Sequence, residues 1–174
     1  MIKLFVQKNK KIQAFTLIEL IVVIAIIGIM LAIILPNYHK MREDYALFRA
    51  SHRLAQDLRR AQEMALSTIS HSCPGSSKLK GYGIIFTINS DDSYSLQAMC
   101  DSNPNLIKSI YLEKEVKISG LTASPLNVFF YPPDPMVDFS SGGDSVEITL
   151  SLRDGTGSPK HIIVNKAGLI YVQP

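Results

Sequence analysis

An unbroken apolar run from Phe15 to Leu35 constrains this chain more than any other feature. The run holds 21 residues, and only Thr16 and Glu19 within it are clearly polar. As a helix rising about 1.5 Å per residue, it would extend roughly 30 Å, the thickness of the hydrocarbon core of a bilayer. A secretory signal peptide has a shorter apolar core followed by a small-residue cleavage site, and no such site follows Leu35. We therefore predict a membrane-spanning helix that stays attached to the chain.

The charges on either side of this run predict its orientation. The first 14 residues contain four lysines and no acid, whereas the remaining residues carry 14 basic and 15 acidic side chains. The positive-inside rule places the N-terminus in the cytoplasm and everything after Pro36 on the outer side of the inner membrane. A general nucleic-acid binder would need a basic surface, which the near-neutral balance of the exported part does not indicate.

Behind Pro36 the apolar pattern continues as a helical stripe. Tyr38, Met41, Tyr45 and Phe48 recur at spacings of three and four, and a second set of apolar residues extends the stripe. That set is Leu47, Ala50, Leu54, Leu58, Ala61 and Ala65. We predict one helix from about Phe15 to about Ile69, with Pro36, which lacks a backbone donor, as a site for a bend. The second half of the helix is apolar on one side only, so it should cover another layer.

From Tyr82 onward the pattern favours β-structure. Runs rich in β-branched and aromatic residues predict strands, and short polar segments predict the turns between them. The predicted strands are 82–88, 93–99, 106–112, 126–131, 145–152, 161–165 and 169–173. The predicted connections are a turn at Ser90–Asp92, a 13-residue loop at Pro132–Asp144, a link at Arg153–Pro159 and a hairpin turn at Asn165–Gly168.

The sequence therefore predicts an α+β fold, in which a long N-terminal helix packs on an antiparallel β-sheet domain. Four parts follow along the chain: a basic leader (1–14), a membrane helix (15–36), an amphipathic helix (37–70) and a β-rich globular domain (71–174). The two cysteines, Cys73 and Cys100, lie in the part predicted to be exported, where an even count favours a disulfide. Two unpaired thiols and a metal pair are the alternatives, although no Cys-x-x-Cys spacing or nearby His cluster supports a metal.

The segment AFTLIELIVVIAIIGIMLAIILP (residues 14–36) resembles the N-terminus of type IV prepilins and type II secretion pseudopilins. The resemblance implies cleavage between Ala14 and Phe15 by a prepilin peptidase, with Ala14 where the family usually has Gly. It also implies N-methylation of Phe15. Gly28 and Pro36 fall where the family has a helix-loosening Gly and a Pro.

In such filaments Glu19 would face the Phe15 amine of a neighbouring subunit, because a buried carboxylate is much less costly when paired. The alternative is an acid that snorkels to the membrane interface.

A second, looser resemblance covers residues 48–67 and 148–172. These segments are similar to the GspH/FimT-like minor pseudopilins, which end in two strands joined by a turn containing Gly. The resemblance implies a minor filament subunit that interacts with other subunits, a prepilin peptidase and an inner-membrane assembly platform. Its helix would occupy the membrane before assembly and the core of a pilus or pseudopilus afterwards.

Two other classes of function were weighed against a filament subunit. Arg49, Arg53, Arg59 and Arg60 would form a basic stripe in a DNA-capturing minor pilin, but interspersed acids favour a salt-bridged helix face. A signal-anchored periplasmic enzyme or binding domain would need a pocket with clustered titratable groups. No nucleotide-binding, hydrolase or metalloprotease motif occurs in the sequence, so we predict no catalytic residue, no metal site and no cofactor.

Overall fold

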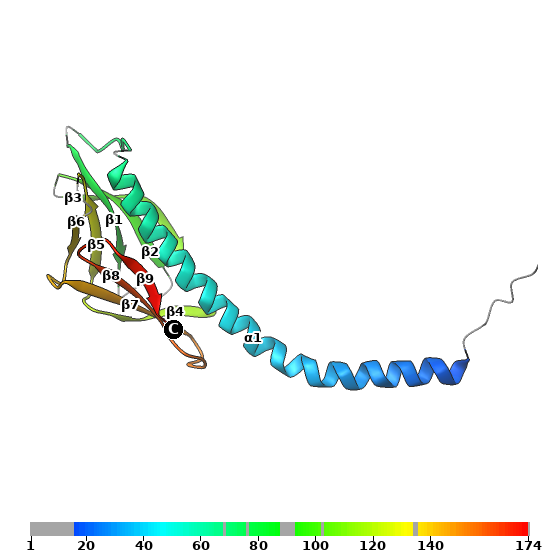
Figure 1. The fold of residues 1–174 in the computed structure, drawn as a ribbon. Coiled ribbons are helices and arrows are strands. Elements are labelled where there is room, and N and C mark those ends of the chain that lie inside the picture. Colours follow the sequence, from blue (N-terminus) through cyan, green and yellow to red (C-terminus); the bar gives the residue numbers. More distant parts are fainter. Residues whose placement is uncertain are drawn as a thin grey trace, which may run out of the picture. The chain divides into compact units, whose positions relative to one another are not determined.

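The computed structural model describes residues 16–67, 69–75, 77–87, 93–101, 103–133 and 136–173. The chain divides into two compact units, residues 1–40 and 41–174. In the described ranges it has one helix, α1 (Leu17–Leu66), and nine strands (Figure 1). The strands are β1 (Leu79–Phe86), β2 (Ser93–Cys100), β3 (Asn103–Tyr111), β4 (Val116–Leu121), β5 (Leu126–Tyr131), β6 (Met136–Phe139), β7 (Ser145–Leu152), β8 (Lys160–Asn165) and β9 (Ile170–Gln173).

The single helix predicted from the sequence is confirmed, with ends two or three residues inside the predicted limits. At its beginning, the backbone N–H of Glu19 donates to Thr16 Oγ1 at 3.3 Å, which is the geometry of an N-cap. At its end, Ser67 donates through both its N–H and its hydroxyl to the carbonyl of Glu63. The bend at Pro36 stays a prediction.

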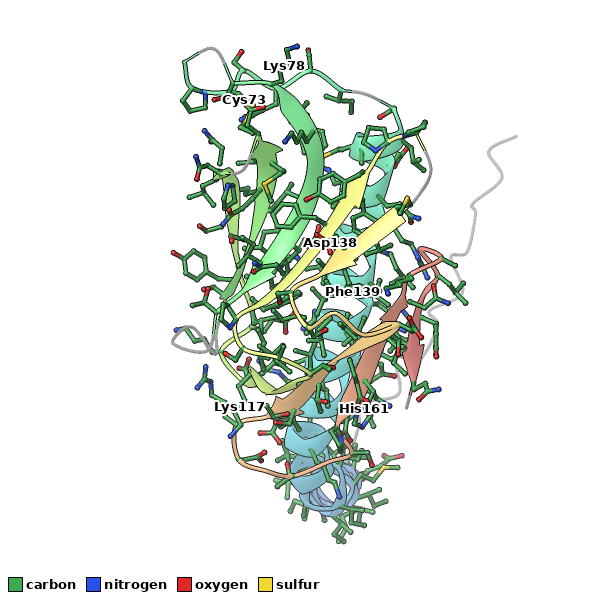
Figure 2. The ribbon with its side chains drawn as sticks, turned by 90° about the vertical axis from the view of Figure 1, so that its left-hand side faces the viewer. Cys73, Lys78, Lys117, Asp138, Phe139 and His161 are labelled. Atoms are coloured by element: carbon green, nitrogen blue, oxygen red, sulfur yellow. A yellow bond between two sulfur atoms is a disulfide. The ribbon has the colours of Figure 1, made fainter. Side chains whose placement is uncertain are left out.

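The nine strands form two antiparallel sheets instead of the single sheet expected. The five-stranded sheet has the order β3-β2-β1-β5-β6, and the four-stranded sheet has the order β4-β7-β8-β9. The α+β class is confirmed, because one side of α1 from Ala46 to Ala65 packs into one hydrophobic core with residues from both sheets. Burial alternates along β2 and β7, as expected for strands with one face on a core. Figure 2 shows side chains of this unit, with Cys73 and Lys78 at one end and Lys117 and His161 toward the other.

Two strands correct the sequence prediction. β6 lies inside the segment Pro132–Asp144, which was predicted as loop; Val137 and Phe139 point into the core from it. β4 was not predicted at all, although Val116 and Ile118 are buried on either side of Lys117. Both strands are short and are flanked by Pro, Gly or Ser, so turn signals concealed the alternation.

Two other predicted connections agree with the structure. Arg153–Pro159 joins β7 to β8. Asn165–Gly168 turns between β8 and β9, where the Gly168 N–H donates to the Asn165 carbonyl at 2.9 Å and Gly168 has φ +79°. The turn predicted at Ser90–Asp92 lies outside the described residues.

Candidate functional site

The first turn of α1 brings Thr16 and Glu19 together. Besides accepting the Glu19 N–H, the Thr16 hydroxyl donates to Glu19 Oε2 at 3.4 Å. Threonine followed three residues later by glutamate is the sequence signature of a capping box. Sequence reasoning assigned Glu19 only an intermolecular role and missed this local one, although the Thr-x-x-Glu spacing would have revealed it.

The helix that follows this cap exposes its apolar side chains. Leu17–Leu35 has a mean hydropathy of 3.2, contains no buried residue and is long and apolar enough to cross a membrane. At Gly28, in its middle, no described atom beyond the neighbouring residues and the local helix backbone lies within 4 Å of the position that a Cβ would occupy. An apolar helix that no other described residue covers needs lipid or another helix around it.

Ala14 and Phe15, the residues predicted to flank a cleaved bond, lie outside the described residues. The structure therefore places Glu19 and Gly28 on one exposed helix and does not test their predicted roles. Pro36 occupies a position within α1, and the helix loosening predicted between Gly28 and Pro36 stays a prediction.

The apolar stripe predicted behind Pro36 splits into two faces. Residues of the second set, from Leu47 to Ala65, are buried in the core. Met41, Tyr45 and Phe48 are instead 55%, 61% and 52% exposed. The expectation that these three help to cover the sheets is wrong, because they point away from the side of α1 that the strands occupy.

The four arginines singled out in the sequence are all exposed, but their partners differ. Arg49 forms a salt bridge with Glu113 at 2.9 Å. Arg59 donates to the carbonyl of Ile170 at 3.0 Å and so ties the helix to β9. Neither Arg53 nor Arg60 forms an ion pair with another described residue. Two of the four side chains are therefore engaged by protein acceptors, and the basic stripe stays a prediction.

Asp57, on the same helix, accepts a hydrogen bond from the Tyr94 hydroxyl of β2 at 2.6 Å. Burial, this hydrogen bond and the charge of Asp57 raise the pKa of Tyr94 above its ordinary value of 10.0, and the charge of Arg53 opposes the shift. The pair joins the helix to the five-stranded sheet at the border of the core. A hydrogen bond to a charged group contributes about 1.5–3 kcal/mol.

This pair predicts how stability depends on pH. Because the unfolded state loses the tyrosine proton first, the free energy of unfolding should fall as the pH rises above about 10. Tyr94→Phe should flatten this dependence, although Tyr82 and Tyr131, whose pKa values are also raised by burial, will retain part of it. Urea unfolding between pH 7 and pH 11 measures the effect. Tyr111→Phe, at a 70% exposed position, is the control and should leave the pH dependence unchanged.

Cys73 and Cys100 form a disulfide, with their Cα atoms 5.7 Å apart. The bond links the segment after α1 to the last residue of β2, as the sequence predicted. Two backbone contacts lie beside it, because the Asp101 N–H donates to the Lys78 carbonyl and the Lys78 N–H donates to Asp101 Oδ2. The two alternatives weighed for the cysteines, free thiols and a metal pair, are therefore excluded for this state of the chain.

His161, Glu147 and Thr149 form a polar cluster on the four-stranded sheet. His161 Nδ1 lies 2.5 Å from Glu147 Oε1 and 3.3 Å from Thr149 Oγ1. A nucleophile–base–acid relay needs one partner on each ring nitrogen, whereas both partners here meet the same nitrogen. The cluster thus does not have the geometry of a catalytic triad. Among the described residues, no group of three or more His, Cys, Asp or Glu could hold a metal ion.

Comparison with known proteins identifies one segment. Residues 9–35 match the family model of the prokaryotic N-terminal methylation motif. No curated protein and no solved structure matches the chain significantly. The matched range contains Ala14, Phe15, Glu19 and Gly28, so the predicted resemblance to type IV prepilin-like proteins is confirmed for this segment. The narrower resemblance to GspH/FimT-like subunits is not confirmed.

Proposed function

We propose that this chain, a type IV pilin-like precursor by its N-terminal methylation motif, is a minor structural subunit of a type IV pilus or type II secretion pseudopilus. A prepilin peptidase removes residues 1–14 and leaves a free amine on Phe15, which is then methylated. The subunit waits in the inner membrane with its N-terminus on the cytoplasmic side. An assembly platform then transfers it to the filament, where its helix packs against those of other subunits.

One observation carries this proposal: α1 begins with a capped Thr16–Glu19 turn and continues as an apolar span that is exposed throughout among the residues that the structure describes. A membrane anchor alone needs the span but not an acid in it, because an acid within a span is costly. A filament subunit needs both. The coincidence of the acid, the exposed span and the methylation motif therefore favours assembly over simple anchoring.

The DNA-capturing alternative stays a prediction: Arg49 and Arg59 are engaged by protein acceptors, and Arg53 and Arg60 are exposed. Whether the leader is cleaved distinguishes a filament subunit from the signal-anchored alternative.

The N-terminus of the mature protein tests the proposal. Co-expression with an active prepilin peptidase should yield a chain that begins with methylated Phe15, as measured by mass spectrometry. Ala14→Leu, which replaces the small residue before the bond, should remain uncleaved, and a chain made without the peptidase should keep Met1. An intact Met1 in the presence of active peptidase would contradict the proposal and favour a simple signal anchor.

A further inference from the structure

The exposed side of α1 within the unit 41–174 carries an apolar row. Met41, Tyr45 and Phe48 follow one another at spacings of four and three, so they lie on one strip of the helix. Each is more than half exposed. The ring of His52 lies 4.3 Å from that of Phe48 and extends the strip by one turn. A monomeric surface seldom keeps such a row of large side chains without a partner.

An arginine row runs beside the apolar row. Arg42, Arg49 and Arg53 are all exposed, and spacings of seven and four place them on one strip. Tyr45 lies three residues from Arg42 and four from Arg49, so the two rows adjoin. Arg49 is paired with Glu113, whereas Arg42 and Arg53 form no ion pair within the part of the chain that the structure describes. The two rows together form what we call the two-row surface: Met41, Tyr45, Phe48 and His52 with Arg42, Arg49 and Arg53.

We propose that the two-row surface docks on the anionic phospholipid headgroups of the membrane while the subunit awaits assembly. Helices that lie in a membrane interface combine an apolar strip with flanking Arg or Lys. Tyrosine is enriched at the headgroup level, and each Arg near an anionic surface adds attraction. The surface also begins only six residues after the span that ends at Leu35, so a bend between the two would bring it to the bilayer. The proposal rests on the proposed membrane anchorage and not on filament membership.

Docking requires the chain to turn between the span and Met41. A straight helix along the membrane normal would carry Phe48 about 20 Å beyond Leu35, which is past a headgroup layer roughly 5–8 Å deep. The proposal therefore includes the bend predicted at Pro36, which would incline the second half of the helix toward the membrane surface. In this state the buried side of α1 keeps its contacts with the sheets, and only the two-row surface faces lipid.

The chain has no tryptophan, so single Trp substitutions report the contact directly. Full-length Phe48→Trp, reconstituted in phosphatidylglycerol vesicles with brominated acyl chains, should show blue-shifted fluorescence that the bromine quenches. Met136→Trp, at a 70% exposed position on β6, is the control and should show neither effect. Ile27→Trp, within the span, should be quenched if the chain is anchored. Loss of quenching for Ile27→Trp would mean that anchorage itself fails, whereas its loss for Phe48→Trp alone would overturn only the docking.

Charge reversal tests the arginine row. In the Phe48→Trp background, Arg42→Glu with Arg53→Glu should abolish the quenching and the blue shift. Lys78→Glu with Lys80→Glu makes the same change in net charge at the other end of the unit and should preserve both. If the Phe48→Trp emission shifts only as the protein concentration rises, and brominated lipid does not quench it, the row is a contact between subunits and the proposal is wrong.

Discussion

Glu19→Gln is expected to be cleaved like the wild-type chain and then to accumulate in the membrane as a processed monomer. On the proposed function, the peptidase acts on the monomer at the Ala14–Phe15 bond, four residues before Glu19, so cleavage should not need the carboxylate. Assembly should need it, because the incoming Phe15 amine would otherwise be buried without a partner. Breaking a buried ion pair costs about 3–5 kcal/mol, which corresponds to a loss of incorporation of roughly 10²-fold or more.

Because Glu19 also contacts Thr16 in the first helical turn, the substitution must separate the role of its charge from that of this contact. The Thr16 hydroxyl caps the Glu19 N–H and also donates to the Glu19 carboxylate, and an N-cap contributes about 1 kcal/mol. Glu19→Gln keeps a side-chain acceptor for the Thr16 hydroxyl and removes only the charge. Glu19→Ala removes the charge and that acceptor but keeps the backbone N–H that Thr16 caps, and Thr16→Ala removes the cap while the charge stays. If pairing is the role of Glu19, Gln and Ala should fail equally, and Thr16→Ala should assemble nearly normally.

Leader removal and filament incorporation are followed in the same cells, by mass spectrometry of the membrane fraction and by immunoblotting of sheared filaments. The opposite ranking, with Glu19→Gln assembling like the wild type and Thr16→Ala failing, would show that Glu19 acts through the helix end and would refute the pairing role. Reduced cleavage of Glu19→Gln would show that the peptidase recognises the Glu19 carboxylate.

The N-terminal half of the fold was predictable because its signal is physical and local. An apolar run of 21 residues with a single acid in it predicts a long apolar helix with few alternatives, and its orientation in a membrane stays a prediction. For the part of the helix after Pro36, the sequence does not show which apolar side chains are buried and which are exposed. Met41, Tyr45 and Phe48 have the spacing of core residues, and only the positions of the strands show that they point away from the core.

The β domain was predictable in class but not in arrangement. Alternation identifies a strand but does not say which strands become neighbours, so the division into two sheets could not be derived. The short strands β4 and β6 were not predicted from the sequence, because Gly120 and the prolines around 132–135 dominate their local pattern. The Asp57–Tyr94 contact joins residues 37 apart in sequence, and no spacing rule anticipates a pair of that kind.

The cysteine pairing, in contrast, was predicted correctly, because two cysteines leave only one intramolecular choice. Breaking the bond is expected to have the largest effect on stability of any single change outside the core. The disulfide closes a loop of 27 residues, for which the chain-entropy model gives about 3–4 kcal/mol. It holds the segment after α1 against the end of β2, beside the Lys78–Asp101 backbone contacts, so those contacts should loosen with it.

Cys73→Ser is the cleaner substitution, because Cys73 is half-buried whereas Cys100 is only 3% exposed. It should lower the free energy of unfolding by about 3–4 kcal/mol, measured by urea unfolding of the full chain in detergent. The oxidised wild type should fall to the same value when reductant is added, and Cys73→Ser should not respond to reductant. Cys100→Ala should lose more than Cys73→Ser, because it also leaves a cavity in the core. Equal stability of the oxidised and reduced wild type would mean that the Lys78–Asp101 contacts alone hold this segment, and the disulfide would then have no structural effect.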